Sequence, residues 1–208
     1  MGFGSERPRA EEDSAEIILD AAEALFAERG FAGAKTQEIA DRSGYDKKLL
    51  FYRFGSKEGL YKAVIKRALL RMGAFNFQWG NDPGTLVGNF ELALGALTDF
   101  AAAHRSAVRI IVREAMDSGD AIRDVLGEVI PQVFGAAERN FREAQARGEV
   151  AEFDPRHFLI TVGGASLFYF LVVDFLRDLW GVDPLAPAEL KRRKEALARA
   201  ILDGLRPR

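Results

Sequence analysis

The spacing of apolar side chains constrains the fold of this chain more than any other feature. Apolar residues recur three and four positions apart along most of the sequence, which is the repeat of an amphipathic α-helix, and no segment alternates apolar and polar residues over the length of a strand. The first such stripe predicts a helix over about 14–29 and consists of Ile18, Ala22, Leu25 and Phe26. Ser14 is its expected N-cap and Gly30 its expected end. The sequence therefore predicts an all-α fold.

The same spacing, interrupted by Gly, Ser and Pro, predicts the remaining helices. Two short helices are predicted over 37–42 and 47–54, with Thr36 and Asp46 as their N-caps. The helix over 121–147 is expected to break near Pro131, because proline removes a helical hydrogen bond. The longer predicted helices lie near 57–73, 86–104, 106–117, 121–147, 155–179 and 188–205.

A segment rich in Gly, Asn, Asp and Pro at 75–85 is predicted to be a loop between two domains. On this basis the chain divides into four parts with different expected roles. They are a flexible N-terminal arm (1–13), a three-helix helix-turn-helix domain (14–56), a connecting helix (57–75) and a larger C-terminal helical domain (76–208).

Composition excludes several classes of protein. The chain has 208 residues, two histidines and no cysteine, which argues against a disulfide framework, a metal centre and a His-based catalytic triad, so no cofactor is predicted. The longest uncharged stretch, 158–173, has 16 residues, whereas a membrane-spanning helix needs about 20. The first residues also have no apolar run typical of a secretory signal. We therefore expect a soluble, cytoplasmic protein without a membrane partner.

Positive charge is concentrated in one short segment. The chain has a formal net charge of −2, yet the segment 35–67 contains nine basic and four acidic residues. A small basic segment on an acidic body indicates a localised anionic partner, although a solvated helical surface would have the same composition.

The segment 36–54 has the anatomy of a helix-turn-helix. Two short helices are joined by a turn that contains Gly44, and the N-terminal end of the second helix begins with Lys47 and Lys48. In this motif the second helix enters the major groove of DNA. Thr36 and the first turn of its helix offer a hydroxyl and backbone N–H groups to a phosphate. The segment therefore predicts binding to double-stranded DNA.

Many spaced positions around this motif match a known pattern together. They are the run ILDAAEALFAERGF (18–31), Thr36, Ile39, Ala40, Gly44, Leu50, Phe54, Ser56, Lys57, Glu58 and Leu60. With these residues the segment 16–70 resembles the N-terminal domain of the TetR family of bacterial transcriptional regulators. The resemblance implies a homodimer that binds operator DNA, responds to a small effector and most often acts as a repressor.

The resemblance also implies which side chains meet DNA. The family usually has Tyr where Phe51 stands, and that hydroxyl typically meets a phosphate. Phe51 keeps the ring without the hydroxyl, and neighbouring Tyr52 is expected to take over part of the contact. The expected DNA-contacting residues are Thr36, Gln37, Lys47, Lys48, Phe51, Tyr52, Arg53 and Lys57.

In this family the C-terminal helices form a ligand cavity and a dimer interface. The segment 158–176 is apolar on nearly every side, and the segment 188–205 carries a leucine-rich stripe. The two C-terminal helices, about 156–179 and 188–205, are therefore the predicted homodimer face. The stripe consists of Leu190, Leu197, Ile201 and Leu205. Because the chain has 16 phenylalanines, a small apolar or aromatic effector is expected. Its predicted pocket residues are Phe90, Leu94, Leu97, Ile111, Phe134 and Phe168.

Two other functions stay open at this point. An all-helical enzyme is disfavoured because no residues have recognisable catalytic spacing and no Gly-rich phosphate loop is present. A DNA-binding protein without an effector would use its large apolar C-terminal domain for dimerisation alone. A gel shift separates the enzyme from both DNA-binding proteins, and a ligand-induced thermal shift separates the two DNA-binding proteins.

Overall fold

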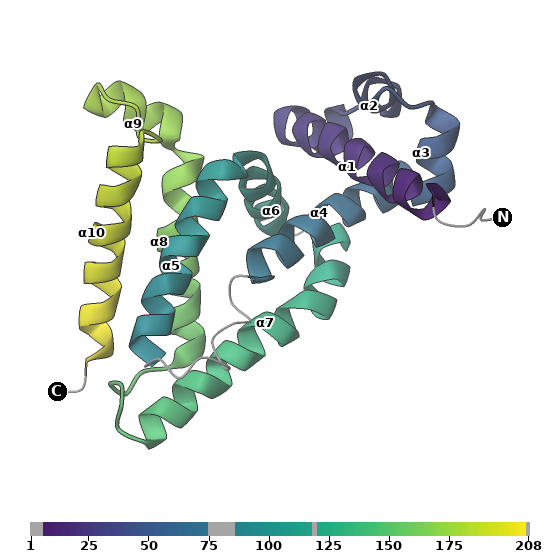
Figure 1. The fold of residues 1–208 in the computed structure, drawn as a ribbon. Helices are drawn as coiled ribbons and strands as arrows, with labels where there is room; N and C mark the ends of the chain where they lie inside the picture. Colours follow the sequence, from purple (N-terminus) through teal and green to yellow (C-terminus); the bar gives the residue numbers. More distant parts are fainter. Residues whose placement is uncertain (1–5, 75–85, 118–119, 207–208) are drawn as a thin grey trace. The chain divides into compact units, whose positions relative to one another are not determined.

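The described part of the chain is built from helices. The computed structural model describes residues 6–74, 86–117 and 120–206, and these residues form helices joined by turns, with no strand among them (Figure 1). The prediction of an all-α fold is confirmed. The predicted loop at 75–85 lies outside the described residues.

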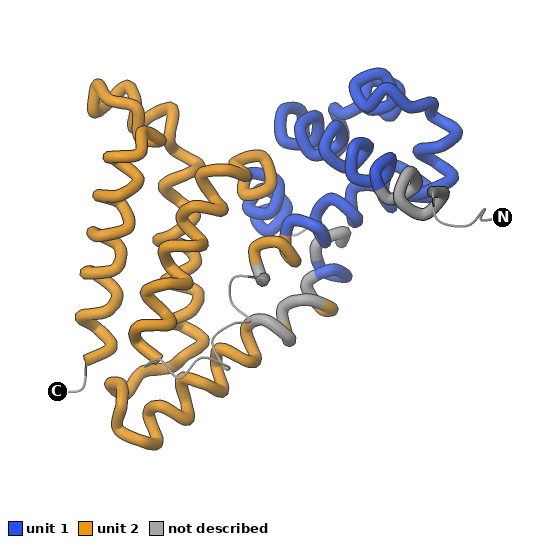
Figure 2. The backbone as a smooth tube through the Cα atoms, in the orientation of Figure 1, with its two compact units in different colours: residues 1–68, 109–125 blue, residues 69–108, 126–208 orange. Residues whose placement is uncertain are grey.

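The helices form two compact units, which Figure 2 shows in two colours. Unit 1 consists of residues 1–68 and 109–125, and unit 2 consists of residues 69–108 and 126–208. Three helices contribute residues to both units, so each unit contains segments that are far apart in the sequence. They are α4 (Lys57–Ala74), α6 (Arg105–Asp117) and α7 (Asp120–Ala146).

The core of unit 1 is the apolar stripe that the sequence predicts. In α1 (Glu6–Gly33), the side chains of Ile18, Ala22, Leu25 and Phe26 are buried. Leu60 and Val64 of α4 are buried with them, together with residues of the short helices α2 (Thr36–Ser43) and α3 (Lys47–Phe54). Burial of one stripe from each helix is the main stabilising contribution to such a bundle.

Helix α1 differs from the prediction at its start. It begins at Glu6, not at Ser14, and Ser14 is a buried residue inside the helix. The residues 6–13, predicted to be a flexible arm, are helical because Glu, Ala and Arg have high helix propensity. The predicted interruption at Gly30 is confirmed, since this glycine has a φ of 71°.

A buried arginine joins α4 to α1 within unit 1. The side chain of Arg67 is only 8% exposed, and its guanidinium lies 3.0 Å from Glu16, 2.8 Å from Asp20 and 2.8 Å from Glu23. Successive carboxylates on one face of α1 thus surround one cation. This network fixes α4 against the helix that carries the core stripe.

Unit 2 is a helical bundle with an aromatic core. Helix α5 (Leu86–Ala103) packs against α8 (Pro155–Leu171) and α10 (Pro187–Leu205), and the three lie side by side in Figure 1. The ring of Phe141, on α7, lies 5.4 Å from that of Phe90 and 5.3 Å from that of Phe158. Helix α9 (Val173–Trp180) follows α8.

Two predictions about helix continuity were wrong. The single helix predicted over 155–179 is two helices, α8 and α9, which meet at Val172 with a bend of 66°. No Gly or Pro stands at this break, so local propensity does not signal it. In contrast, α7 continues past Pro131, where a break was expected.

Helix α5 is long and apolar enough to cross a bilayer, and so is the bent pair α8–α9. However, Phe90, Ala93 and Leu94 of α5 are buried in the core of unit 2. A central helix of a globular unit has this composition too.

Candidate nucleic-acid interface

The connection between α2 and α3 is a tight turn with local hydrogen bonds. Gly44 has a φ of 74°, in the left-handed region that favours glycine, and ends α2. The Ser43 hydroxyl bonds to the Ala40 carbonyl oxygen at 3.0 Å. Asp46 accepts a hydrogen bond from the Leu49 backbone N–H at 2.7 Å and so caps α3, as predicted.

One face of α3 anchors the helix to the rest of unit 1. Leu50 is 0% exposed, and the α2 residues Ile39 and Ala40 are also buried. Tyr45, in the turn, is half-buried. Because this face is held, the opposite face of α3 has a fixed orientation.

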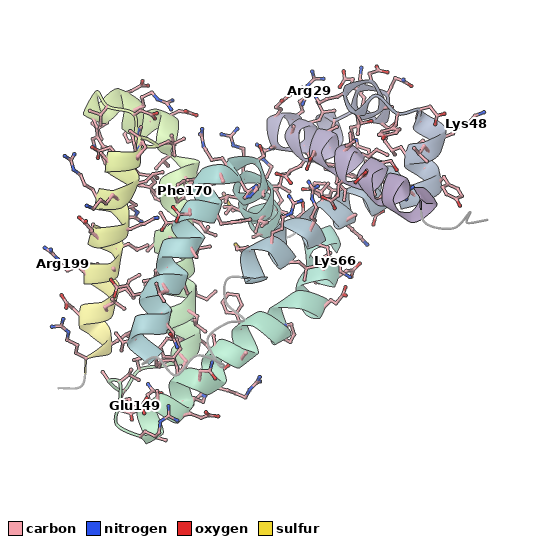
Figure 3. All side chains as sticks on the ribbon, viewed as in Figure 1. Arg29, Lys48, Lys66, Glu149, Phe170 and Arg199 are labelled. Atoms are coloured by element: carbon pink, nitrogen blue, oxygen red, sulfur yellow. The ribbon has the colours of Figure 1, made fainter. Side chains whose placement is uncertain are left out.

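The opposite face of α3 is exposed and carries four of the predicted contact residues. Lys47, Lys48, Phe51 and Tyr52 occupy positions i, i+1, i+4 and i+5, which share one side of a helix. The Tyr52 side chain is 86% exposed. The Lys47 ammonium lies 5.6 Å from the centre of the Phe51 ring, and Lys48 extends away from the helices in Figure 3. We name these four residues the α3 face.

Arg53 does not belong to the α3 face. Its position in the helical repeat places it on the side opposite Phe51. Its side chain is half-buried, and its Nε has no hydrogen-bond partner within the described residues. A DNA contact through Arg53 stays a prediction, and this position supports it less than the other positions on α3.

The start of α2 differs in detail from the prediction. Lys35 occupies the N-cap position, Thr36 is the first helical residue, and no side chain caps the helix. The expected N-cap role of Thr36 was therefore wrong, but its half-buried hydroxyl stands in the first turn, beside backbone N–H groups. The Gln37 amide donates a hydrogen bond to Asp41 at 2.9 Å.

Lys57 begins α4 next to the helix-turn-helix. Ser56 caps this helix by accepting a hydrogen bond from the Gly59 N–H at 2.9 Å. The Lys57 ammonium lies 4.7 Å from the centre of the Phe31 ring and 3.4 Å from the Ala32 carbonyl oxygen. These neighbours are neutral, so the positive charge of Lys57 remains available to a phosphate.

Ion pairs divide the basic residues of the segment 35–67 into two groups. Arg42 pairs with Glu28, Lys62 pairs with Asp124, and Arg67 pairs with carboxylates of α1. Lys66 also has an interaction within the protein. Five other cations have no ion pair within the described parts of the chain, and all five precede Glu58. They are Lys35, Lys47, Lys48, Arg53 and Lys57. The uncompensated charge therefore gathers at the helix-turn-helix and the start of α4.

Lys35 is a further candidate for a phosphate contact, which the set predicted from the sequence does not include. It is exposed, it has no ion pair among the described residues, and it immediately precedes the first turn of α2. A basic residue just before Thr36 was the available signal. Its position beside free backbone N–H groups suits a phosphate.

The six predicted pocket residues are distributed over both units. Phe90 and Leu94 are buried in the aromatic core of unit 2, whereas Ile111 belongs to unit 1. Leu97 and Phe134 are half-buried, on α5 and α7. Phe168 is 63% exposed and lines an open groove of about 560 Å³ between α8, α9 and α10. Hydrophobicity alone did not separate core residues from surface residues.

The predicted dimer stripe on α10 was also partly misplaced. Leu197 is 4% exposed and Leu205 is 0% exposed, and Ile201 packs against the same core cluster. These side chains stabilise unit 2 itself, because they are the face by which α10 packs on α5 and α8. The opposite side of α10 is exposed.

The turn, the anchored α3 and its exposed basic and aromatic face define a helix-turn-helix DNA-binding protein. The family profile described as "Bacterial regulatory proteins, tetR family" matches residues 18–64, and the one described as "Tetracyclin repressor-like, C-terminal domain" matches residues 87–201. The chain belongs to the TetR family of bacterial transcriptional regulators, and its resemblance to that family is confirmed.

Relatives with assigned names match over nearly the whole chain. The HTH-type transcriptional regulator RutR of Escherichia coli (strain K12) is 25% identical over 97% of this chain and 95% of that protein. The HTH-type transcriptional repressor SCO4008 of Streptomyces coelicolor is 28% identical over 89% of this chain and 93% of that protein. The structure of the fatty acid degradation regulator FadR from Bacillus halodurans has a TM-score of 0.72 at 18% identity, covers 92% of this chain and 99% of that one, and shows a shared fold.

Proposed function

We propose that this protein is a homodimeric transcriptional repressor that reads operator DNA through α3 and is released when a small effector binds unit 2. The observation that supports DNA reading best is the α3 face. Its four side chains are exposed on a capped helix whose other face is buried, so the backbone that carries them is held in place before DNA binds. Such preorganisation suits recognition of base edges in the major groove.

The same proposal assigns phosphate contacts around the α3 face. Thr36 and Gln37 begin α2, Lys57 begins α4, and Lys35 precedes α2. Backbone N–H groups at helix starts and unpaired ammonium groups are typical phosphate ligands. These residues would position the protein on DNA, while Lys47, Lys48, Phe51 and Tyr52 would discriminate between sequences.

The proposed dimer rests on exposed apolar side chains of unit 2. Ile160 and Phe168 of α8 are 68% and 63% exposed, and Phe175 of α9 is 65% exposed. Phe168 lines the 560 Å³ groove together with Leu176 and Trp180. Contiguous exposed apolar side chains of this kind are typical of interfaces. A two-fold dimer would read two half-sites about 10–10.5 base pairs apart, or a multiple of that spacing.

Two observations support repression and effector response, namely the family and the size of unit 2. SCO4008, which matches most of this chain, is named a repressor. Unit 2 has a large apolar core, far more than a DNA reader needs, so a small apolar or aromatic effector is the proposed ligand. Helices α4, α6 and α7 continue from one unit into the other, which gives a covalent route for coupling. The protein would act in the cytoplasm, where bacterial DNA lies.

Selection of bound sequences from random double-stranded DNA tests the proposal directly. We expect the full chain to enrich a pseudo-palindrome, and the Lys47→Ala/Lys48→Ala variant to bind it more weakly with relaxed base preference, by about 1–3 kcal/mol per lost base contact. An Arg139→Ala/Arg142→Ala variant removes the same charge from α7 and should keep both affinity and preference. Unchanged preference in the lysine variant would refute the assigned recognition helix.

In vitro transcription from the selected site then tests repression. We expect added protein to lower transcript yield from a promoter that overlaps the site. Increased yield would identify an activator instead. A thermal-shift screen of small aromatic and acyl compounds tests the effector. A compound that binds the folded protein should raise its melting temperature. If it is the effector, it should also weaken DNA binding, and DNA should weaken its binding by the same factor.

A further inference from the structure

Helix α10 carries a stripe of charged and small residues on its exposed side. The stripe consists of Arg192, Glu195, Ala196, Arg199, Ala200 and Asp203, which line a shallow open groove of about 480 Å³. We name these six residues the α10 stripe. Every one of them is exposed, while Leu197 and Leu205 on the other side of the helix are buried in unit 2. Figure 3 shows Arg199 extending away from the neighbouring helices of unit 2.

The charges of the α10 stripe alternate along the helix. From the N-terminal end they are Arg192, Glu195, Arg199 and Asp203, which is positive, negative, positive, negative. Read in the opposite direction, the order of signs is inverted. A second copy of the helix laid antiparallel would therefore place Arg192 opposite the partner's Asp203 and Glu195 beside the partner's Arg199. A parallel, in-register copy would place each charge against itself, which is unfavourable.

The dimensions of the stripe suit direct helix pairing. Arg192 and Asp203 are eleven positions apart, which is three helical turns and about 16 Å along one face. Ala196 and Ala200 occupy the middle, where their small side chains allow two helices to approach closely, at about 8 Å between axes. The charged pairs would then flank a small apolar centre.

Present contacts leave the charges of the stripe available. Arg192 pairs with Glu189 on its own helix at 2.6 Å, Asp203 lies 3.5 Å from Arg206, and Glu195 lies 4.0 Å from Lys191. These pairs join near neighbours along the chain, and in each of them the stripe residue itself is exposed, although Glu189 is only 18% exposed. The stripe residues can therefore exchange these contacts for contacts with a partner. Arg199 has no ion pair among the residues that the structure describes.

The stripe is continuous with the exposed apolar surface of unit 2. Arg192 and Ala196 also line the 560 Å³ groove that contains Phe168 and Trp180. One helix face is too small for a stable dimer, which typically buries about 1,200–2,000 Å² in total. The apolar surface of α8 and α9 would supply the remaining area, and the charged stripe would fix how the two copies align.

We propose that α10 pairs antiparallel with α10 of a second copy, about a two-fold axis near the middle of the stripe. Two ion pairs of Arg192 with the partner's Asp203, and two of Glu195 with the partner's Arg199, set the register. An isologous contact of this kind uses the same surface on both copies, as two-fold symmetry requires. The inference rests on the proposed dimer and adds its polarity, its register and the residues that determine them.

Charge reversal tests the register in the full-length protein. In Arg192→Glu or Asp203→Arg, both symmetry-related pairs become like-charged, so we expect the dimer dissociation constant from sedimentation equilibrium to rise at least about ten-fold, with a larger rise at low salt. The double variant Arg192→Glu/Asp203→Arg restores opposite charges, and its dissociation constant should return to within about three-fold of wild type. Glu195→Arg, Arg199→Glu and their double variant repeat the test on the second pair.

Lys191→Glu is the matched control, because it makes the same charge change on α10 but outside the stripe. It should change dimerisation little. Circular dichroism and thermal unfolding check that each variant is folded. A monomeric wild type at all concentrations would overturn the proposed dimer itself. A dimeric wild type whose affinity is insensitive to the single reversals, or is not rescued in the double variants, would overturn only the antiparallel register.

Discussion

The Tyr61 hydroxyl donates a 2.8 Å hydrogen bond to the buried carboxylate of Glu114, which joins α4 to α6 within unit 1. Burial, and then the bond to Glu114, raise the pKa of Tyr61 above its ordinary value. Tyr61→Phe would leave the carboxylate without this donor, so we expect a loss of about 1–3 kcal/mol in the free energy of unfolding, measured by urea denaturation. Tyr52→Phe removes the same hydroxyl oxygen from an exposed ring and should leave the free energy of unfolding almost unchanged. Equal effects in the two variants would contradict this account.

Arg67 should contribute more to stability than an exposed arginine. Arg67→Met leaves Glu16, Asp20 and Glu23 without their shared cation, and Glu23 is only 12% exposed. Removing one partner of a buried pair costs about 3–5 kcal/mol. The comparison is Arg29→Met, because Arg29 pairs with Glu38 at the surface and should cost less than about 1 kcal/mol. Chemical denaturation of both variants measures the difference.

Substitutions at two nearby positions on α3, Leu50 and Tyr52, should have different effects, one on stability and the other on DNA binding. Leu50→Ala removes a side chain that is 0% exposed and should lower the free energy of unfolding by about 2–5 kcal/mol. Tyr52→Ala removes a side chain that is 86% exposed and should leave stability within about 0.5 kcal/mol of wild type. We expect the Tyr52 variant to bind the selected DNA more weakly in a gel shift. Full affinity in that variant would remove Tyr52 from the proposed interface.

Lys57→Ala should weaken binding to all DNA sequences nearly equally. Its ammonium contacts only the Phe31 ring and the Ala32 carbonyl among described residues, so its charge is free to meet a phosphate. Losing one phosphate contact lowers the slope of log affinity against log salt by about one. Affinities measured at several salt concentrations give the slope. Lys62→Ala is the control, because Lys62 is already paired with Asp124 and should leave the slope unchanged.

Asp154 should make unit 2 sensitive to acid. It caps α8, and the hydrogen bonds from the Arg156 side chain and then from the Arg156 N–H lower the pKa of this carboxyl below its ordinary 3.8. The stabilisation is therefore present above pH 3.8 and is lost as the pH falls below it. Asp154→Asn keeps an oxygen acceptor without the charge. We expect wild type to melt higher than this variant at about pH 6, and the gap to start narrowing only as the pH falls below 3.8 towards the lowered pKa of Asp154.

The helix-turn-helix could be predicted from sequence in detail because its signals are local. The Asp46 cap joins residues three positions apart, and Gly44 and Gly55 adopt positive φ values that few other residues favour. The break between α8 and α9 lacked such a local signal. At Val172 the chain bends without Gly or Pro, so the bend depends on how the two helices pack in unit 2.

The sequence by itself determined the helical fold, the turn at Gly44 and the side of α3 that is exposed, because helix periodicity and capping depend on neighbours within one turn. Only the tertiary structure decided whether a given apolar residue lies in the core or on the surface. Leu197, expected at a dimer face, is buried in the core of unit 2, whereas Phe168, expected in a pocket, is exposed. Apolar residues at helical spacing show that one face of a helix is apolar. They do not show whether the protein core, a ligand or a second subunit covers that face. Contacts between distant segments make that choice, and they left the α10 stripe, from Arg192 to Asp203, facing outward.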